Sequence, residues 1–168
     1  TNNVSSRENA QQWTDNTGNF WIFGGNGHAS TSNLGRLSDM WEYDLTLGEW
    51  TWVSGTSLMN QNGIYGTKSV PSTTNNPGGR SQGVTFVDNA GNLWLFGGHG
   101  YNASNNQGVL NDLWKYDSIS NQWVWMSGES TINARGVYGV KGTASPSNMP
   151  GARYGSVGWT DASGNLWL

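Results

Sequence analysis

The sequence predicts an all-β fold made of repeated four-stranded antiparallel sheets, and three observations carry this prediction. Only 11% of the residues are charged, whereas glycine is abundant and eleven Trp, six Tyr and four Phe are present. A long stretch of sequence recurs at a fixed spacing of 73 residues. Short apolar runs follow turns of the form Asp-x-x-Gly. This mixture suits short strands joined by tight turns better than it suits helices.

The repeat is the strongest of these signals. GNFWIFGG starts at Gly18, GNLWLFGG at Gly91 and GNLWL at Gly164, so the spacing is 73 residues both times. The same shift relates charged and aromatic residues throughout the unit: Arg7, Arg80 and Arg153; Asp39 and Asp112; Trp41 and Trp114; Trp52 and Trp125; Tyr65 and Tyr138. No insertion breaks the register, which indicates a repeat architecture whose loops also keep their length.

Each unit reads as four strands, expected in the second unit at residues 81–87, 92–96, 112–116 and 123–126. Glycine adopts the left-handed conformation that closes a short hairpin, so the turn from Asp88 to Gly91 predicts a hairpin between the first two strands. The second strand, Leu93 to Phe96, is apolar on both faces and needs cover on both sides. Stacked blades of a β-propeller provide that cover.

These residues resemble the kelch motif. Gly97-Gly98, the segment from Asn111 to Asp117 and the spaced Trp123 match it, and Gly24-Gly25 begins the corresponding match in the first unit. The resemblance covers essentially the whole chain and implies a kelch-type β-propeller, of the galactose-oxidase central-domain-like superfamily, with four-stranded antiparallel blades. Another repetitive antiparallel β array is the alternative.

The resemblance also implies boundaries. Blade 1 is expected at about 5–54, blade 2 at about 80–127, and the first two strands of a third blade at about 153–168. A propeller closes with about four to eight blades, so about 2.3 blades make an incomplete ring. The expected partners are the remaining blades or a larger assembly. We expect the isolated chain to be oligomeric or poorly folded, because its outer blades expose apolar faces.

Two long inter-blade segments, 55–79 and 128–152, make this repeat longer than the usual kelch unit of about 50 residues. They carry an aromatic residue at the same offset, Tyr65 and Tyr138. A flexible linker would not repeat an aromatic residue in this way. We therefore expect both segments to be ordered and packed.

Candidate ligand-binding residues lie on the face that holds these long loops. Arg7, Arg80 and Arg153 precede the strand that is innermost in kelch propellers, and a ring of guanidinium groups there would suit carboxylate or sulfate ligands. The alternative is that each arginine pairs with a structural aspartate, such as Asp39 or Asp112, or with loop carbonyls.

Two further candidates, His99 and Tyr101, are expected in the loop between the second and third strands. An exposed tyrosine there could stack on a sugar ring. The two histidines do not occupy equivalent repeat positions, and no cluster has metal-ligand spacing. We therefore predict no metal site and no cofactor.

Composition and charge argue against some classes of partner and activity. The formal net charge of −3 and the pI near 5.1 argue against a nucleic-acid partner, and no apolar run is long enough for a membrane span. The copper radical oxidases that act on galactose share the propeller but need a cysteine, and this chain has none.

The sequence predicts a non-catalytic binding or structural module of a larger secreted or surface protein, extracellular and bacterial, which binds a protein or a glycan through the long-loop face. The alternative is part of a carbohydrate-active enzyme whose catalytic residues lie in other blades. An intracellular adaptor is disfavoured because inter-blade loops are short in that class.

Overall fold

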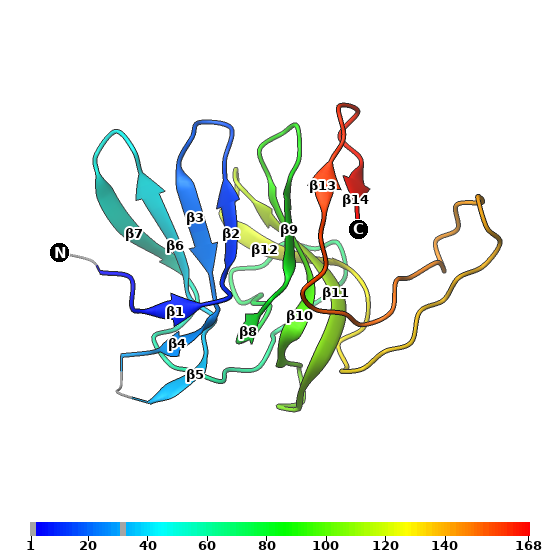
Figure 1. Cartoon of the computed structure of the whole chain (residues 1–168), viewed down its shortest axis with the longest axis horizontal. Coiled ribbons are helices and arrows are strands. Elements are labelled where there is room, and N and C mark those ends of the chain that lie inside the picture. The colour runs from blue at the N-terminus through cyan, green and yellow to red at the C-terminus, as the bar shows by residue number, and fades with distance from the viewer. Residues whose placement is uncertain (1–2, 31–32) are drawn as a thin grey trace.

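The computed structural model describes residues 3–30 and 33–168, and these residues form strands, turns and extended segments without a helix. Two four-stranded antiparallel blades stand side by side, followed by a pair of strands from a third blade (Figure 1). The sheets of the described residues do not close into a ring. The predicted all-β propeller architecture with an incomplete ring is therefore confirmed. No helix of the described residues is long and apolar enough to span a membrane.

Blade 1 consists of an upper sheet and a lower extension. The upper sheet has the order β2 (Gln11–Thr14), β3 (Phe20–Phe23), β6 (Met40–Asp44) and β7 (Glu49–Ser54). The extension has the order β1 (Arg7–Glu8), β4 (Asn26–His28) and β5 (Leu34–Arg36). The extension continues the β3–β6 pair beyond Gly24-Gly25.

Blade 2 repeats this pattern with longer strands. It contains β8 (Arg80–Ser81), β9 (Val84–Val87), β10 (Leu93–Tyr101), β11 (Gln107–Asp117) and β12 (Gln122–Ser127). The predicted first strand is split, because Gln82 between β8 and β9 takes a left-handed φ of 58°.

The predicted boundary of the second strand was wrong: β10 does not end at the glycine pair but runs through it, with a register shift between Phe96 and Gly98. Gly97 has a φ of +62°, and a Cβ there would stand 2.7 Å from the Arg153 carbonyl oxygen. The glycines thus make a bulge that lets the next segment approach the backbone, and strand pairing resumes beyond it.

Each Asp-x-x-Gly hairpin is closed by its aspartate. In blade 2, Asp88 Oδ1 accepts hydrogen bonds from the backbone N–H groups of Ala90 (3.0 Å) and Asn92 (2.9 Å), and Oδ2 accepts one from Trp94 Nε1 (2.8 Å). Partial burial acts to raise the pKa of Asp88, but these and the other hydrogen bonds lower it overall. The predicted hairpins are confirmed, with Gly91 in the left-handed region at φ +83°.

The third blade is represented by β13 (Trp159–Thr160) and β14 (Leu166–Trp167). This pair lies against blade 2, where Thr160 Oγ1 donates to the Val87 carbonyl oxygen (3.1 Å). Leu166 packs on a small cluster of Val84, Phe86 and Phe96. Apolar packing of this kind holds one blade against the next.

The main core lies between blades 1 and 2. Its buried members come from both blades and from the segment between them: Trp13, Phe23, Met40, Tyr65, Leu93, Leu95, Trp114, Tyr116 and Trp123. Leu93 and Leu95 belong to this core, whereas Phe96 belongs to the cluster on the other face. The prediction that this strand is covered on both sides is therefore confirmed.

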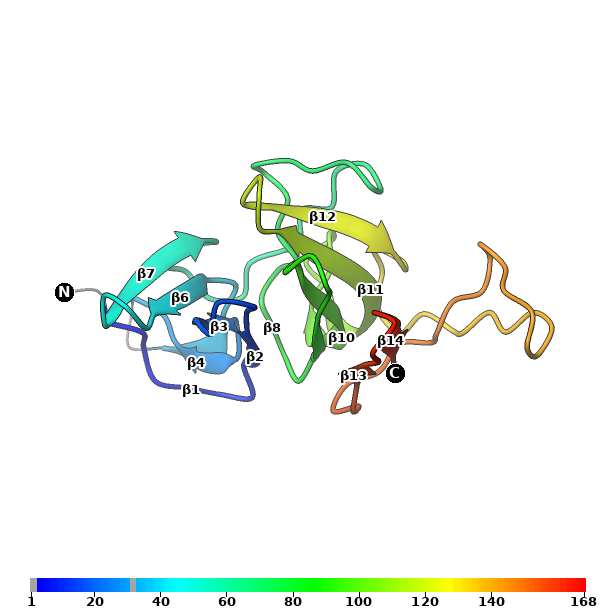
Figure 2. The same cartoon turned by 90° about the horizontal axis from the view of Figure 1, so that it is seen from above.

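The two long segments differ in their surroundings. Residues 55–79 lie across the outer strand β12 of blade 2, as the view from above shows (Figure 2). Residues 128–152 project away from the body. Tyr65 is 6% exposed and Tyr138 is 82% exposed. The expectation of a packed segment is met by 55–79. It was wrong for the middle of 128–152, which projects while the ends of this segment are hydrogen-bonded to β11 through Glu129, Asn133 and Pro150.

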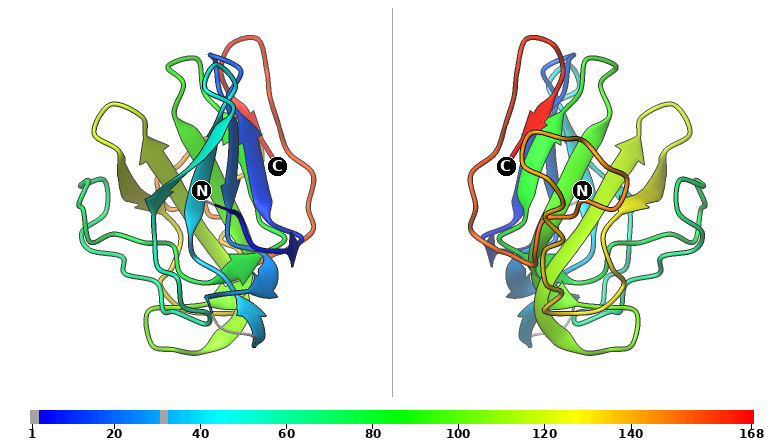
Figure 3. Two further views of the ribbon diagram at one scale, coloured as in Figure 1. Left: turned by 90° about the vertical axis from the view of Figure 1, so that its left-hand side faces the viewer. Right: turned by 90° about the vertical axis from the view of Figure 1, so that its right-hand side faces the viewer.

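The short hairpin turns gather at one end of the strands, and the tip of the β10–β11 hairpin lies at the opposite end (Figure 3). Antiparallel strands alternate in direction, so connections of the two kinds must separate in this way. The long-loop face is therefore the lower face of Figure 1.

Candidate ligand-binding site

Arg80 is fully buried and makes a two-pronged ion pair with Asp112. The Nη1–Oδ1 distance is 2.7 Å and the Nη2–Oδ2 distance is 2.8 Å. Nη1 also donates to the Gly97 carbonyl oxygen (3.0 Å) and Nη2 to that of Pro77. Burial acts to lower the pKa of Arg80, but the carboxylate of Asp112 outweighs it and the pKa is raised. The guanidinium group is thus a structural element facing the protein interior.

The same geometry recurs at Arg7, whose Nη1 lies 2.7 Å from Asp39 Oδ1 and whose Nη2 lies 2.8 Å from Oδ2. Arg153 is half-buried, and within the described residues its side chain hydrogen-bonds through Nε to the Gly151 carbonyl oxygen (3.1 Å). The structure therefore shows the aspartate pairing foreseen as the alternative for Arg7 and Arg80, and it turns neither group toward a ligand.

Tyr65 completes the Arg80–Asp112 pair from the preceding inter-blade segment. Its hydroxyl donates to Asp112 Oδ2 (2.7 Å), which also accepts from Trp114 Nε1 (2.7 Å). The phenol ring contacts Trp114 and Trp125, with ring centroids 4.9 and 5.0 Å apart. Burial, followed by the charge of Asp112, raises the pKa of Tyr65 well above its ordinary value. Sequence reasoning identified this tyrosine by its repetition but not its role.

The placement of His99 and Tyr101 in a loop was wrong, because both lie in β10. His99 Nδ1 lies 3.2 Å from Arg36 Nη2, and its ring meets that of Tyr154 edge-on at 6.0 Å. Burial and then the Arg36 charge lower the pKa of His99. Tyr101 is half-buried, and its backbone N–H donates to the Gly79 carbonyl oxygen (2.9 Å). Because the strand continues past the bulge at Gly97-Gly98, both residues belong to β10.

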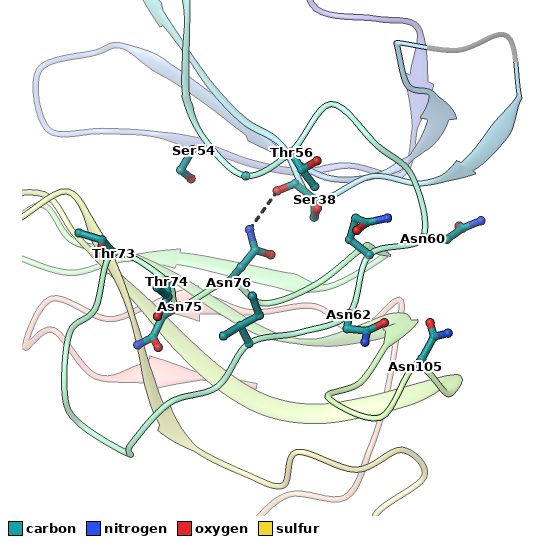
Figure 4. A pocket seen from close by; sticks show the side chains of 13 residues that line it. Ser38, Ser54, Thr56, Asn60, Asn62, Thr73, Thr74, Asn75, Asn76 and Asn105 are labelled. Atoms are coloured by element: carbon teal, nitrogen blue, oxygen red, sulfur yellow. Dashed lines mark hydrogen bonds between the residues drawn. The ribbon is translucent and has the colours of Figure 1, made fainter.

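A cavity of about 660 Å³ opens on the long-loop face, between blade 1 and the segment 55–79 (Figure 4). Its wall is made almost entirely of hydroxyl and amide side chains, and none of the lining residues is ionisable: Ser38, Ser54, Gly55, Thr56, Asn60, Gln61, Asn62, Ile64, Thr73, Thr74, Asn75, Asn76 and Asn105. Such a wall offers donors and acceptors without charge.

Three oxygens in this wall, Ser38 Oγ, Ser54 Oγ and Asn75 Oδ1, are buried and make no hydrogen bond within the described protein. A buried polar atom without a partner costs about 1–3 kcal/mol. The surfaces of these three atoms are also closed to solvent, so they lie behind the cavity surface. The exposed side chains of Asn62, Thr73 and Thr74 are the polar groups that a ligand in the cavity meets.

Other side chains hold the wall in place. Asn60 Oδ1 accepts from the Arg36 backbone N–H (2.8 Å), and Asn76 Oδ1 accepts from that of Gly78 (2.7 Å). Asn76 Nδ2 reaches toward the Ser38 carbonyl oxygen across the cavity at 3.5 Å, the contact dashed in Figure 4. The wall of the segment 55–79 is thus anchored to blade 1, which favours a preformed site.

None of the arginine, histidine and tyrosine candidates from the sequence lines this cavity. Serine, threonine and asparagine are also the ordinary residues of turns, so their presence in a long segment does not single them out. Only the folding of 55–79 against blade 1 brings them together. In the described part of the chain, no group of three His, Cys, Asp or Glu side chains is placed to hold a metal ion.

Comparison with known proteins supports the same architecture. The Kelch motif matches residues 80–128, which are blade 2. Among 106 matching chains of solved structures is one titled "Structure of YjhT", a kelch-type propeller protein. It is 20% identical, with a TM-score of 0.50 over 73% of this chain and 38% of that chain.

This chain thus spans well under half of the YjhT structure. No curated protein matches the sequence significantly. At this level of identity the likeness concerns the fold alone, and it agrees with the repeat, the glycine bulges and the blade order described above. The chain is therefore a kelch-repeat β-propeller whose described blades form an incomplete ring.

Proposed function

We propose that this chain is a non-catalytic binding module that takes a neutral, hydroxyl-rich ligand, a glycan, in the cavity on its long-loop face. The observation that carries the proposal is the cavity wall of hydroxyl and amide side chains, which has no formal charge. Kelch propellers typically serve as protein-interaction modules, and the chemistry of this cavity is what favours a glycan here.

The cavity wall and a sugar match in their hydrogen-bond donors and acceptors. Sugar hydroxyls both donate and accept, so they can pair with the exposed amide of Asn62 and the exposed hydroxyls of Thr73 and Thr74. Ile64, which is 52% exposed, offers an apolar patch in the same wall for the C–H face of a sugar ring. A wall without formal charge gives little attraction to a phosphorylated or sulfated ligand.

The cavity wall lacks an ionisable side chain, so general acid–base catalysis has no residue in it. We further propose that the module works outside the cell or on its surface, in a bacterium. The low charge and the long, ordered inter-blade segments support this placement.

The first experiment removes one exposed hydroxyl of the wall. Thr74→Ala should weaken binding of a neutral oligosaccharide selected from a glycan array by about two- to tenfold, since one hydrogen bond contributes about 0.5–1.5 kcal/mol. Ser147→Ala, at the repeat-equivalent position outside the cavity, is the matched control, because the hydroxyls of Thr74 and Ser147 pair in the same way with those of Ser72 and Ser145.

The second experiment fills the cavity. Ile64→Trp should abolish glycan binding, whereas Val137→Trp, at the equivalent position in the projecting segment, should leave it intact. Equal affinity of the Ile64→Trp variant and the unmodified chain, measured by titration calorimetry, would refute the site. Failure to bind any neutral glycan on the array would refute the ligand class.

A further inference from the structure

Four side chains meet where blade 1, blade 2 and the start of the third blade come together, and we call them the Arg36 cluster. Arg36, at the end of β5, reaches blade 2, where its Nη1 donates to Ser81 Oγ of β8 and its Nη2 lies 3.2 Å from His99 Nδ1 of β10. Tyr154, which is 53% exposed, meets the His99 ring edge-on. The cluster lies at the lower end of the blades in Figure 1, and none of its members lines the cavity proposed for the glycan.

The repeat indicates that the blades do not need these side chains. The arginine–aspartate pair recurs in both blades, as Arg7 with Asp39 and as Arg80 with Asp112. The Arg36 cluster does not recur, although the strand pairing around it does. The residues at the equivalent positions are Val109 for Arg36, Asn26 for His99 and Glu8 for Ser81. The fold therefore accepts other residues at these positions, and a structural requirement does not explain the cluster.

Arg36 carries a charge that no carboxylate of the described residues pairs with. Its two side-chain partners, Ser81 Oγ and His99 Nδ1, are neutral acceptors. A guanidinium group has five N–H donors, so most of them are left over. None of the Arg36 nitrogen atoms is both buried and without a partner, which means that the unused donors face solvent.

His99 adds a second donor to the cluster. A guanidinium group can only donate, so Nδ1 of His99 accepts and the ring proton is on Nε2. Within the described residues Nε2 makes no hydrogen bond, and it is not buried. The cluster thus presents one formal positive charge and several unused N–H groups at a half-buried position.

We propose that the Arg36 cluster binds a carboxylate group of a ligand. The planar fork of a guanidinium group matches the two oxygens of a carboxylate, and the hydrogen bonds are strengthened by charge. One formal positive charge offsets one negative charge, so a singly charged carboxylate suits the cluster better than a doubly charged phosphate. This second site is independent of the glycan cavity.

Carboxylate binding is coupled to the protonation of His99. Burial, followed by the charge of Arg36, lowers the pKa of His99 in the free protein. A bound carboxylate offsets the charge of Arg36 and favours the imidazolium, so binding raises the pKa of His99. By reciprocity, the affinity for the carboxylate rises as the pH falls.

The other charged side chains on the adjoining strands have partners of their own. Glu8 lies two strands away from Arg36 on β1, and it accepts a hydrogen bond from the asparagine between them (3.2 Å). Arg80 is fully buried in its ion pair, and Arg153 donates to a carbonyl oxygen of the segment before it. Among the described residues, Arg36 is therefore the charged group that acts on His99.

The test titrates acetate at constant ionic strength, with chloride as the balancing anion, and follows backbone amide signals by NMR. Signals of β8 and of the end of β10 should move and saturate. Arg36→Val installs the residue of the equivalent position in blade 2 and should weaken acetate binding at least about tenfold. Arg135→Val removes the same charge from an exposed position of the segment 128–152, and this control should bind acetate normally.

The dependence on pH and on the anion completes the test. Acetate affinity should rise between about pH 7.5 and about pH 5.5, which brackets the ordinary pKa of histidine. His99→Asn, which installs the residue found in blade 1, should remove this rise. Inorganic phosphate should bind more weakly than acetate.

Four results would overturn the proposal. They are acetate signals that do not saturate, equal binding by Arg36→Val, a rise with falling pH that persists in His99→Asn, and tighter binding of phosphate. Thr74→Ala should bind acetate normally, so failure of this site and failure of the glycan cavity are distinguishable.

Discussion

The arginine–aspartate pairs of the two blades show how one side chain can bind several backbone carbonyl groups. Arg80 binds Asp112 and the carbonyl oxygens of Gly97 and Pro77, so it joins three segments that are distant in sequence. Asp112 is shared with Tyr65 and Trp114. A buried charge of this kind is tolerated because Asp112 Oδ2 also accepts from Tyr65 and Trp114, although Arg80 Nε has no hydrogen-bond partner in the described protein.

Removal of one partner should therefore be costly in blade 2 and cheap in the third blade. Arg80→Ala leaves Asp112 buried without its counter-charge and should lower the free energy of unfolding by about 3–5 kcal/mol. Arg153→Ala, at the half-buried equivalent position, should change it by less than about 0.5 kcal/mol. Urea denaturation followed by tryptophan fluorescence measures both, and equal losses would contradict this account.

The inter-blade segments show how neighbouring packing, and not sequence alone, fixes a long loop. Residues 55–79 and 128–152 have the same internal pairing, but only the first has its middle held by a neighbouring blade. Asn75 Nδ2 donates to the Trp123 carbonyl oxygen (2.9 Å) and adds to the anchoring by Tyr65. Opening of the middle of the first segment must break these contacts, whereas the second segment is hydrogen-bonded to blade 2 near its ends, through Glu129, Asn133 and Pro150.

Limited proteolysis should report this difference through a matched pair of lysines. Trypsin cleaves only segments that open locally, so Lys141 in the projecting segment should be cut well before Lys68 in the seated one. Lys68 is additionally held over the Trp125 ring. Mass spectrometry of a short digestion at low protein concentration gives the order of cleavage. Cleavage at Lys68 first would show that the seated segment opens more readily.

The two blades and the segment between them share one aromatic core, and tyrosine burial couples the stability of this unit to alkaline pH. Burial, followed by the charge of Glu42, raises the pKa of Tyr116 from 10.0 to about 12. The pKa of Tyr65 is raised as well. A raised pKa means that the folded state keeps protons that the unfolded chain releases.

Stability should therefore be fully present below pH 10.0 and should fall as pH rises toward about 12. Thermal melts across this range, with ultraviolet absorbance to follow phenolate formation, measure the effect. The two buried tyrosines, Tyr65 and Tyr116, should ionise together with the unfolding transition. A melting temperature that does not change across the range would exclude this linkage.

Much of the fold could be predicted because the same pattern of residues occurs in both repeats. The blade order, the Asp-x-x-Gly hairpins and the two-sided cover of Leu93 to Phe96 all follow from local patterns. The continuation of β10 to Tyr101 could not be predicted, because a glycine pair reads equally well as a strand end or as a bulge. His99 and Tyr101 were misplaced for that reason.

The candidate site was harder to predict. The lining residues come from the connection before β6, the end of β7, the segment 55–79 and the tip of the β10–β11 hairpin, and nothing in their spacing marks them as neighbours. The arginines were candidates because they carry charge, yet the charge of Arg80 is paired with that of Asp112. A repeated arginine can bind a ligand or pair with a structural aspartate, and only the three-dimensional position of the aspartate distinguishes the two roles.

The tyrosine that finishes the Arg80–Asp112 pair belongs, by sequence, to the preceding repeat. A repeat counted from Arg80 therefore places Tyr65 in the preceding unit, whereas the residues that pack on this tyrosine belong to blade 2. Each copied block thus arrives with a tyrosine for its successor and a need for one from its predecessor, so the array can be lengthened one block at a time without altering any junction.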